Sequence, residues 1–264
     1  MEAIFFAVSI LTSFIGSICG IGGGVIIKPV LDATGVISVS AINFLSGCTV
    51  LAMSAVSVYK SLKEGTAALD IKQATPLAAG AALGGICGKS IFEKFIRQAG
   101  NDNLAGMVQA ILLVIITAGT LLYTAQKSHI KTRACRCFGA CLLIGILLGI
   151  LSGFLGIGGG PINLVVLIYF FSMQTKEAAL SSLYIIMLSQ AASLMRTCLS
   201  HTIPEISFSY LLCMVAGGVL GGMIGSKVNK KISDRNGEKL FVFLMIIIIA
   251  INLYNAVKFG ISAI

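Results

Sequence analysis

Long apolar blocks separated by short polar gaps dominate the chain. A helix needs about 20 apolar residues to cross the hydrocarbon core of a membrane, and the blocks show no alternation of the kind found in membrane β-barrels. Eight blocks can be followed, and their approximate ranges are 3–19, 38–59, 74–92, 104–125, 137–155, 178–199, 208–224 and 240–257. This pattern predicts an all-α polytopic membrane protein with about eight transmembrane segments.

The pentapeptide Gly-Ile-Gly-Gly-Gly occurs twice inside apolar sequence, at residues 20–24 and 156–160. Glycine weakens a helix interior by roughly 1 kcal/mol relative to alanine, so three adjacent glycines predict a break in the helix. The apolar piece that resumes after the first motif, residues 25–31, is too short to span a membrane. We therefore expect the first segment of each half to be broken at this motif.

A second match supports an internal duplication. When the glycine motifs are set in register, Leu-Gly-Gly-x-x-Gly at residues 83–88 aligns with the same pattern at 220–225 after one inserted residue. Two matches in the same order predict two homologous four-segment halves, a first membrane repeat at 1–126 and a second at 137–264. The basic stretch 127–136 is the expected connecting loop. We expect the glycines of the second match to serve close helix packing.

The topology of the halves follows less directly from the sequence. Four simple spans per half would give parallel repeats, whereas a re-entrant first segment would give inverted ones. The positive-inside rule favours the inverted arrangement, because it collects the basic gaps after the second, fourth and seventh blocks on one side. Lys89, Lys94 and Arg97 then fall on the other side, so both arrangements stay open.

The low content and the distribution of charged residues limit the classes of function that the chain can have. Only 11% of the residues are charged, compared with roughly 25% in a soluble domain. The net charge of +9 arises from Lys and Arg in the gaps between apolar blocks, which is typical of loops that face a cytoplasm. No nucleic acid is therefore expected as a partner. The expected partners are a small anion and membrane lipid, and a homo-oligomer stays open.

The cysteines and histidines predict no cofactor and no metal. Six of the eight cysteines lie singly in apolar sequence, where cysteine usually behaves as a small hydrophobe. His129, Cys135 and Cys137 are close in sequence, but their spacing matches no standard zinc pattern. The first residues lack the basic region and cleavage site of a signal peptide, so we expect the first span to be retained.

The strongest candidate site lies at the glycine motifs. A helix that resumes after each break presents free backbone N–H groups at its N-terminus, where the helix dipole also favours an anion. Pro161 suits the first turn of the second resumed helix. The candidate substrate-binding glycines are Gly22, Gly23, Gly24, Gly158, Gly159 and Gly160. The alternative is that they only allow helices to cross closely.

Four side chains complete the predicted site. Lys28 is a cation embedded in apolar sequence, and it either deepens an anion site or extends to water at the membrane interface. Asn163 lies just past the second break, while Ser46 and Gln190 lie within apolar blocks. These polar groups can donate hydrogen bonds to an oxyanion. The alternative is a bond between helices, worth roughly 0.6 kcal/mol each.

The scarcity of acidic residues within the apolar blocks also bears on the function. No Asp or Glu is expected well inside an apolar block, so a carboxylate proton relay has no visible candidate. An inside-negative potential alone favours anion exit by about 2.3 kcal/mol per charge per 100 mV. We therefore expect a secondary transporter that exports small anions. The alternatives are an intramembrane enzyme, which would need catalytic motifs that the blocks lack, and a membrane subunit without transport activity.

The glycine segments resemble a known family. Gly16-x-x-x-Gly20-Ile21-Gly22-Gly23-Gly24 with Pro29-x-Leu31, and the repeat from Gly153 to Pro161, are similar to the sulfite exporter TauE/SafE family, also called toluene-sulfonate uptake permeases. The resemblance covers nearly the whole chain. It implies a multi-pass transporter of the bacterial or archaeal inner membrane that carries sulfite, sulfoacetate or similar sulfur oxyanions and organosulfonates. Lys28 and Val165 depart from the family pattern.

Overall fold

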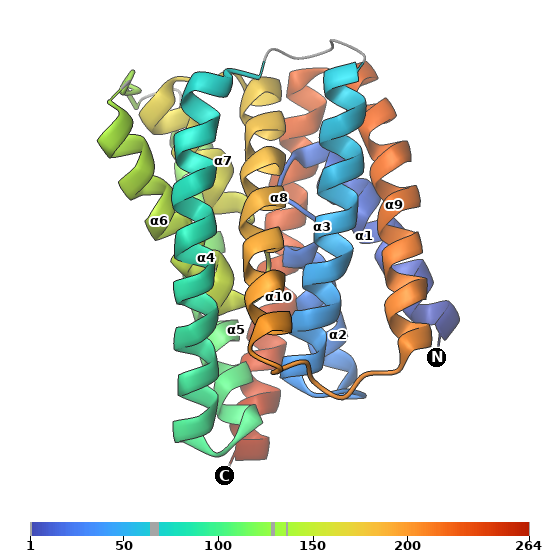
Figure 1. Cartoon of the computed structure of the whole chain (residues 1–264). Helices are drawn as coiled ribbons and strands as arrows, with labels where there is room; N and C mark the ends of the chain where they lie inside the picture. The colour runs from blue at the N-terminus through green and yellow to red at the C-terminus, as the bar shows by residue number, and fades with distance from the viewer. Residues whose placement is uncertain (1, 64–68, 128–129, 136, 264) are drawn as a thin grey trace.

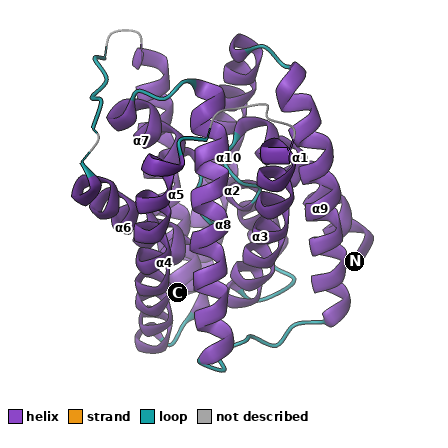
Figure 2. Cartoon of the chain, turned by 45° about the horizontal axis from the view of Figure 1, so that its top comes forward, coloured by secondary structure: helices purple, strands orange, loops and turns teal. Residues whose placement is uncertain are grey.

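The computed structural model describes residues 2–63, 69–127, 130–135 and 137–263. Within these ranges the chain forms ten helices and no strand (Figure 1, Figure 2). Their bounds are α1 Glu2–Cys19, α2 Gly24–Thr34, α3 Val39–Lys63, α4 Ile71–Ala99, α5 Asp102–Gln126, α6 Phe138–Leu155, α7 Pro161–Phe171, α8 Thr175–Leu199, α9 Phe208–Lys231 and α10 Asp234–Ala263. His129, Arg136, Glu64 and Gly65, which the sequence placed in polar gaps, lie outside the described residues.

Seven of the described helices are long and apolar enough to cross a membrane, namely α1, α3, α5, α6, α8, α9 and α10. This confirms the prediction of an all-α polytopic membrane protein. The helices α2 and α7 have 11 residues each and are too short to span. The helix α4 has 29 residues and runs beside the spanning helices, although its sequence is more polar (Figure 1).

Local signals in the sequence explain several helix ends. Asp70 caps α4 by accepting a bond from the backbone N–H of Lys72, at 3.1 Å, and Asn101 caps α5 in the same way. Gly35 and Gly100 end α2 and α4 in the left-handed conformation that favours glycine. The helix bounds at these positions therefore follow from single residues.

Glycines allow two pairs of helices to pack at close range. Along α4 and α6, Gly80 lies against Leu142, Gly84 against Ile146 and Gly88 against Ile150. Along α9 and α1, Gly217 lies against Phe6, Gly221 against Ile10 and Gly225 against Phe14. A Cβ at any of these glycines would overlap or closely crowd backbone atoms of the neighbouring helix, so the packing role predicted for Gly84, Gly88, Gly221 and Gly225 is confirmed.

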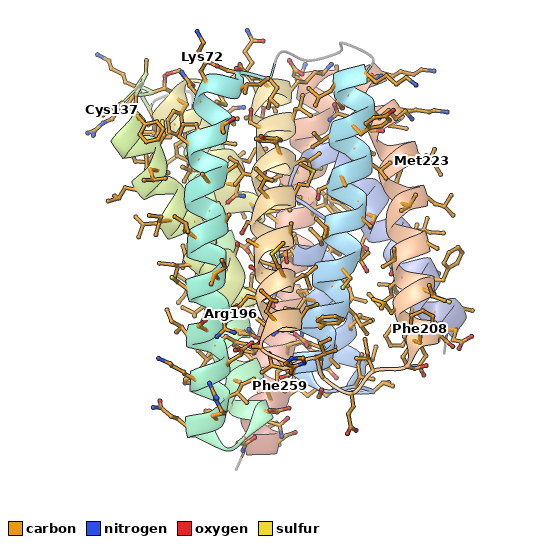
Figure 3. All side chains as sticks on the ribbon, viewed as in Figure 1. Lys72, Cys137, Arg196, Phe208, Met223 and Phe259 are labelled. Carbon is orange, nitrogen blue, oxygen red and sulfur yellow. The ribbon has the colours of Figure 1, made fainter. Side chains whose placement is uncertain are left out.

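The residue order in these contacts also gives the helix directions. Contacts advance together along α4 and α6, and along α9 and α1, so each pair runs in parallel. In Figure 3, Lys72 at the start of α4 and Phe208 at the start of α9 lie toward opposite ends of the bundle. It follows that α1 and α6 enter from opposite ends, and that their C-terminal ends approach one another inside the bundle.

Candidate functional site

The first glycine turn, residues 20–24, reverses the chain between α1 and α2. The α1 helix ends at Cys19, and Gly20 and Gly22 adopt φ values of 71° and 75°, which favour glycine. The carbonyl of Gly23 then accepts bonds from the backbone N–H groups of Ile26 and Ile27. Among the described residues no side chain caps this N-terminus, and the first N–H groups of α2 have no partner within the helix.

The second glycine turn, residues 156–160, separates α6 from α7. Gly156, Gly158, Gly159 and Gly160 have φ values of 67°, 76°, 136° and 112°. Pro161 occupies the first position of α7, where its missing N–H costs no hydrogen bond. No side chain in the described part of the chain caps this helix either. The two turns therefore each lead into the free N-terminus of a short helix.

The two turns meet in the interior of the bundle. A Cβ at Gly24 would overlap the carbonyl oxygen of Ile157, and a Cβ at Gly160 would lie 3.6 Å from Val25 Cγ2. Ile21, Val25 and Ile157 are at most 1% exposed and belong to one hydrophobic core. The N-termini of α2 and α7, each with its partial positive charge, thus approach the same region.

The helices α3 and α8 enclose this meeting point from the sides. Val50 of α3 and Ile186 of α8 both contact Gly22, with a Cβ there lying 3.7 Å from Val50 Cγ1 and 3.2 Å from Ile186 Cδ1. The side chain of Gln190 lies between Gly158 and Gly47, as a Cβ at either glycine would crowd its amide. Gln190, which the sequence singled out, therefore contacts the second turn directly.

Several buried polar groups at the turns lack a partner. Asn43 is 5% exposed and lies against Gly156, and neither atom of its amide forms a hydrogen bond among the described residues. Ser46, three residues further along the same face of α3, is fully buried and its hydroxyl is also unpaired. Ser182 of α8 has the same properties. Buried polar groups are normally satisfied, so these groups are candidates for binding a ligand.

Asn163 is the third residue of α7, within its first turn, and is 2% exposed. Its backbone N–H donates to the carbonyl of Gly160 at 3.2 Å, and its side-chain amide nitrogen faces the Cβ position of Gly159. The other side-chain atom, Oδ1, has no partner among the described residues. Asn163 is therefore positioned beside the second turn, where the sequence placed it.

Polar residues that bond to their own helix differ from these. Thr49, next to Val50, donates its hydroxyl to the carbonyl of Leu45 at 2.8 Å. Ser9 and Thr12 of α1 make equivalent bonds to the carbonyls of Phe5 and Val8. Such local bonds satisfy a hydroxyl inside an apolar block without any ligand. The sequence cannot separate the two groups, because both occur at helical spacing in similar surroundings.

Lys28 is fully buried, which excludes the interpretation that it extends to water at the interface. Its ammonium group donates to Asp32 Oδ2 at 2.7 Å, so the charge is compensated within α2. The expectation that no carboxylate lies inside the apolar segments was therefore wrong. The helix α2 continues to Thr34 and buries Asp32. The i, i+4 spacing of Lys28 and Asp32 was the signal that could have shown this pair.

Two polar clefts flank the turns. The Lys89 cleft is lined by residues that include Asn43, Lys89, Gly156, Gln190, Ser193 and Thr197. The Asn229 cleft is lined by residues that include Ser17, Ser57, Ser61, Ala179, Ser226 and Asn229. The first includes Thr197 near the end of α8, and the second includes Lys176 near its start, so the two clefts lie toward opposite ends of this helix.

The two clefts are lined by residues at equivalent positions of the two segments that are aligned on the glycine motifs. With the glycine motifs in register, Asn43 aligns with Ala179, Ser193 with Ser57, Thr197 with Ser61 and Lys89 with Ser226. The cleft walls therefore come from matching helix faces, although the side chains differ. The sequence analysis did not predict Asn43 or Lys89 as site residues. Asn43 stands within an apolar block, and Lys89 stands at the end of one.

These features define a class of protein: a polytopic α-helical membrane protein with two short interior helices whose uncapped N-termini meet between two polar clefts. A family model described as Sulfite exporter TauE/SafE matches residues 5–253. The chain belongs to this family of membrane transporters, which are not enzymes, and membership implies export of sulfur-containing anions. No curated protein and no solved structure matches the chain.

Proposed function

We propose that the chain exports a sulfur oxyanion or organosulfonate, such as sulfite or sulfoacetate, and holds it between the two glycine turns. The observation that carries the proposal is the meeting of two uncapped helix N-termini beside the unpaired amide of Asn43 and hydroxyl of Ser46. Free N–H groups and hydroxyls are the donors that an oxyanion needs. Gly22, Gly23, Gly24, Gly158, Gly159 and Gly160 let the anion approach the backbone, with Asn163 and Gln190 beside them.

The two clefts suggest how the anion reaches this site. The halves 1–126 and 137–264, joined by 127–136, form an inverted repeat in this proposal, with each first segment broken at its glycine turn. Opposite directions of α4 and α9 and the equivalent cleft positions support this arrangement. Rocking of the halves would open the Lys89 cleft and the Asn229 cleft in turn, which is the usual design of transporters built from inverted repeats.

In this proposal the chain lies in the plasma membrane of a bacterium or archaeon. Large apolar side chains cover the outer face of the bundle, such as Leu122 at 65%, Leu143 at 62% and Phe243 at 60% exposure, and these would contact lipid. An inside-negative potential of 100 mV would drive the exit of a monovalent anion by about 2.3 kcal/mol. Export therefore needs no further energy source in this proposal.

Anion flux in vesicles tests the proposal. The purified chain is reconstituted, and efflux of sulfite, thiosulfate and methanesulfonate is measured with an imposed potential. We expect flux of at least one of these anions above that of empty vesicles. No flux of any sulfur anion from a folded preparation would refute the proposal.

Two variants with a matched control locate the site. Asn43→Ala installs the residue that the second half carries at Ala179, and Ser46→Ala removes one hydroxyl. Each should weaken the apparent affinity about tenfold, because a hydrogen bond to a charged group is lost. Thr49→Val removes a hydroxyl that is satisfied by Leu45 and should leave the affinity unchanged. Equal effects of all three variants would contradict this location.

A further inference from the structure

Two charged residues are buried on the short helix α2. Lys28 is 0% exposed and Asp32 3% exposed, and these are the buried charged residues of the described chain. Their side chains form an ion pair of 2.7 Å. Burying an ion pair in a membrane protein costs free energy, and replacing such a pair with apolar residues is often neutral or stabilising. A buried ion pair in this place therefore calls for a functional explanation.

The pair is only partly satisfied. Asp32 Oδ2 accepts the bond from Lys28, but Asp32 Oδ1 is buried and has no partner among the described residues. On the neighbouring helix α10, Asn255 donates to the carbonyl of Pro29 at 2.8 Å and Lys258 to that of Ala33 at 2.9 Å. A buried carboxylate with one unpaired oxygen can take up a proton without breaking another hydrogen bond.

Other charged groups near the pair are few. From α10, Lys258 acts electrostatically on Asp32, and Lys89 of α4 is close enough for Lys28 to act on it. On α1 the charged residue is the exposed Glu2, and the basic residues of α3 lie in its last turn. Each cation near the pair favours an ionised Asp32, and a proton on Asp32 leaves the positive charge of Lys28 uncompensated.

Lys28 lies near the proposed anion site. It follows Gly24, the first residue of α2, by four positions, which corresponds to about 6 Å along a helix axis. An uncompensated ammonium group at this distance attracts an anion at the helix N-terminus, and the low dielectric of the interior strengthens that attraction. When Asp32 is ionised, its negative charge cancels most of the attraction between Lys28 and the anion.

We infer that Asp32 is a proton-binding site whose occupancy controls the affinity of the glycine turns for the anion. This inference rests on the proposed function. When Asp32 binds a proton, Lys28 becomes an unpaired cation and the anion binds more tightly. Coupling between two sites is reciprocal, so a bound anion also raises the affinity of Asp32 for a proton. The second half carries Leu164 and Ile168 at the equivalent positions, so only α2 supplies this coupling.

The pH dependence of anion binding tests the inference. The probe is methanesulfonate, whose charge is constant across the range used, and binding to the purified full chain is measured by calorimetry between about pH 5 and about pH 8. We expect the wild-type affinity to be about tenfold higher at the acidic end, within the usual range of coupling between sites. A wild-type affinity that does not change with pH would overturn the inference.

A double variant provides the matched control. Lys28→Leu with Asp32→Ile gives α2 the residues that α7 carries, and removing both charges leaves no unpaired ion behind. We expect this variant to fold and to bind the anion with an affinity that no longer depends on pH. A variant that keeps the wild-type pH dependence would assign it to another group and refute the role of Asp32.

A third measurement needs no variant. In weakly buffered solution, addition of methanesulfonate to the wild-type protein should cause uptake of protons, reported by a pH indicator. Binding without proton uptake at every pH would overturn the inference, whether or not the double variant folds. Absence of any anion binding would instead refute the proposed function, so the two failures can be told apart.

Discussion

The two glycine turns have the same five residues but different backbones. In the first turn, Gly23 is helical, with a φ of −66°, and α2 begins at Gly24. In the second, Gly160 has φ 112° and ψ −161°, a conformation that favours glycine, and α7 begins just after the motif, at Pro161. A proline disfavours the helical conformation of the residue before it, which explains why Gly160 lies outside α7 whereas the equivalent Gly24 belongs to α2. The comparison shows that the residue following a motif can decide the conformation of the motif.

The helices that follow the turns differ in charge. Lys28 and Asp32 form a buried ion pair on α2, whereas α7 carries Leu164 and Ile168 at the equivalent positions. Leu164 is 5% exposed and packs in the hydrophobic core. The first turn therefore combines a helix N-terminus with a titratable pair, and the second combines it with Asn163 and an apolar helix.

The largest contrast should come from removing one charge. Lys28→Met leaves Asp32 buried without its partner, and we expect the protein to lose about 3 to 5 kcal/mol of stability. Leu164→Met keeps an apolar side chain of similar volume and should cost less than about 1.5 kcal/mol. Thermal unfolding in detergent, followed by circular dichroism, measures both. Similar unfolding temperatures for the two variants would show that the ion pair does not distinguish the helices.

A smaller contrast is expected between glycines of the two turns. Gly160→Ala places an L side chain in a conformation that only glycine adopts readily, so we expect a loss of about 1 to 3 kcal/mol and of most anion flux. Gly23→Ala keeps a helical backbone, and its Cβ would lie 3.2 Å from Ser13 Cα. Its effect should stay within about 1 kcal/mol of zero.

Unfolding and flux of both glycine variants are measured in the same preparation. Gly100→Ala serves as a control away from the site, because Gly100 also has a positive φ, of 61°, but nothing lies within 4 Å of its Cβ position. It should lower stability without affecting flux per folded molecule. Loss of flux in Gly23→Ala with normal flux in Gly160→Ala would contradict the prediction that the second turn is the more sensitive of the two.

The smallest effect concerns labelling and tests whether the start of α6 and the end of α8 lie on opposite sides of the membrane. Cys137 is exposed at the start of α6, and Cys198 is exposed near the end of α8. In vesicles of one orientation, a membrane-impermeant maleimide should label the first cysteine from one side and the second from the other. Labelling of both cysteines from the same side would show that the start of α6 and the end of α8 lie on the same side of the membrane, which contradicts the prediction.

The pH profile adds a check on Cys137. Backbone N–H groups of Ala140 and Gly139 hold the pKa of the Cys137 thiol below its ordinary value. The thiolate is the reactive form, so its labelling should reach half of its maximal rate at a lower pH than that of an ordinary exposed thiol. Phe138→Pro changes the first residue of α6, a position where proline is tolerated, and retains Cys137. It therefore serves as a control for a change at the helix start. An ordinary profile would show that these N–H groups do not act on the sulfur.

Most of the candidate site could be predicted from the sequence, but not the hydrogen bonds within it. The duplicated motif pointed to Gly22, Gly158 and the glycines that follow them, and the structure brings both turns together. Asn43 was missed because a single Asn in an apolar block has no local feature that marks it as unpaired. Thr49 resembles Ser46 in sequence, yet only Thr49 bonds to its own helix.

By itself, the sequence determined the elements that depend on local chemistry. Apolar block length set the membrane-spanning helices, adjacent glycines ended α1 and α6, and Asp70 and Gly35 fixed helix ends through short-range bonds. Tertiary structure alone decided which polar groups are buried without partners, that α1 packs on α9 and α6 on α4, and that the two turns meet. These features depend on contacts between residues far apart in the chain, which periodicity and local propensity do not encode.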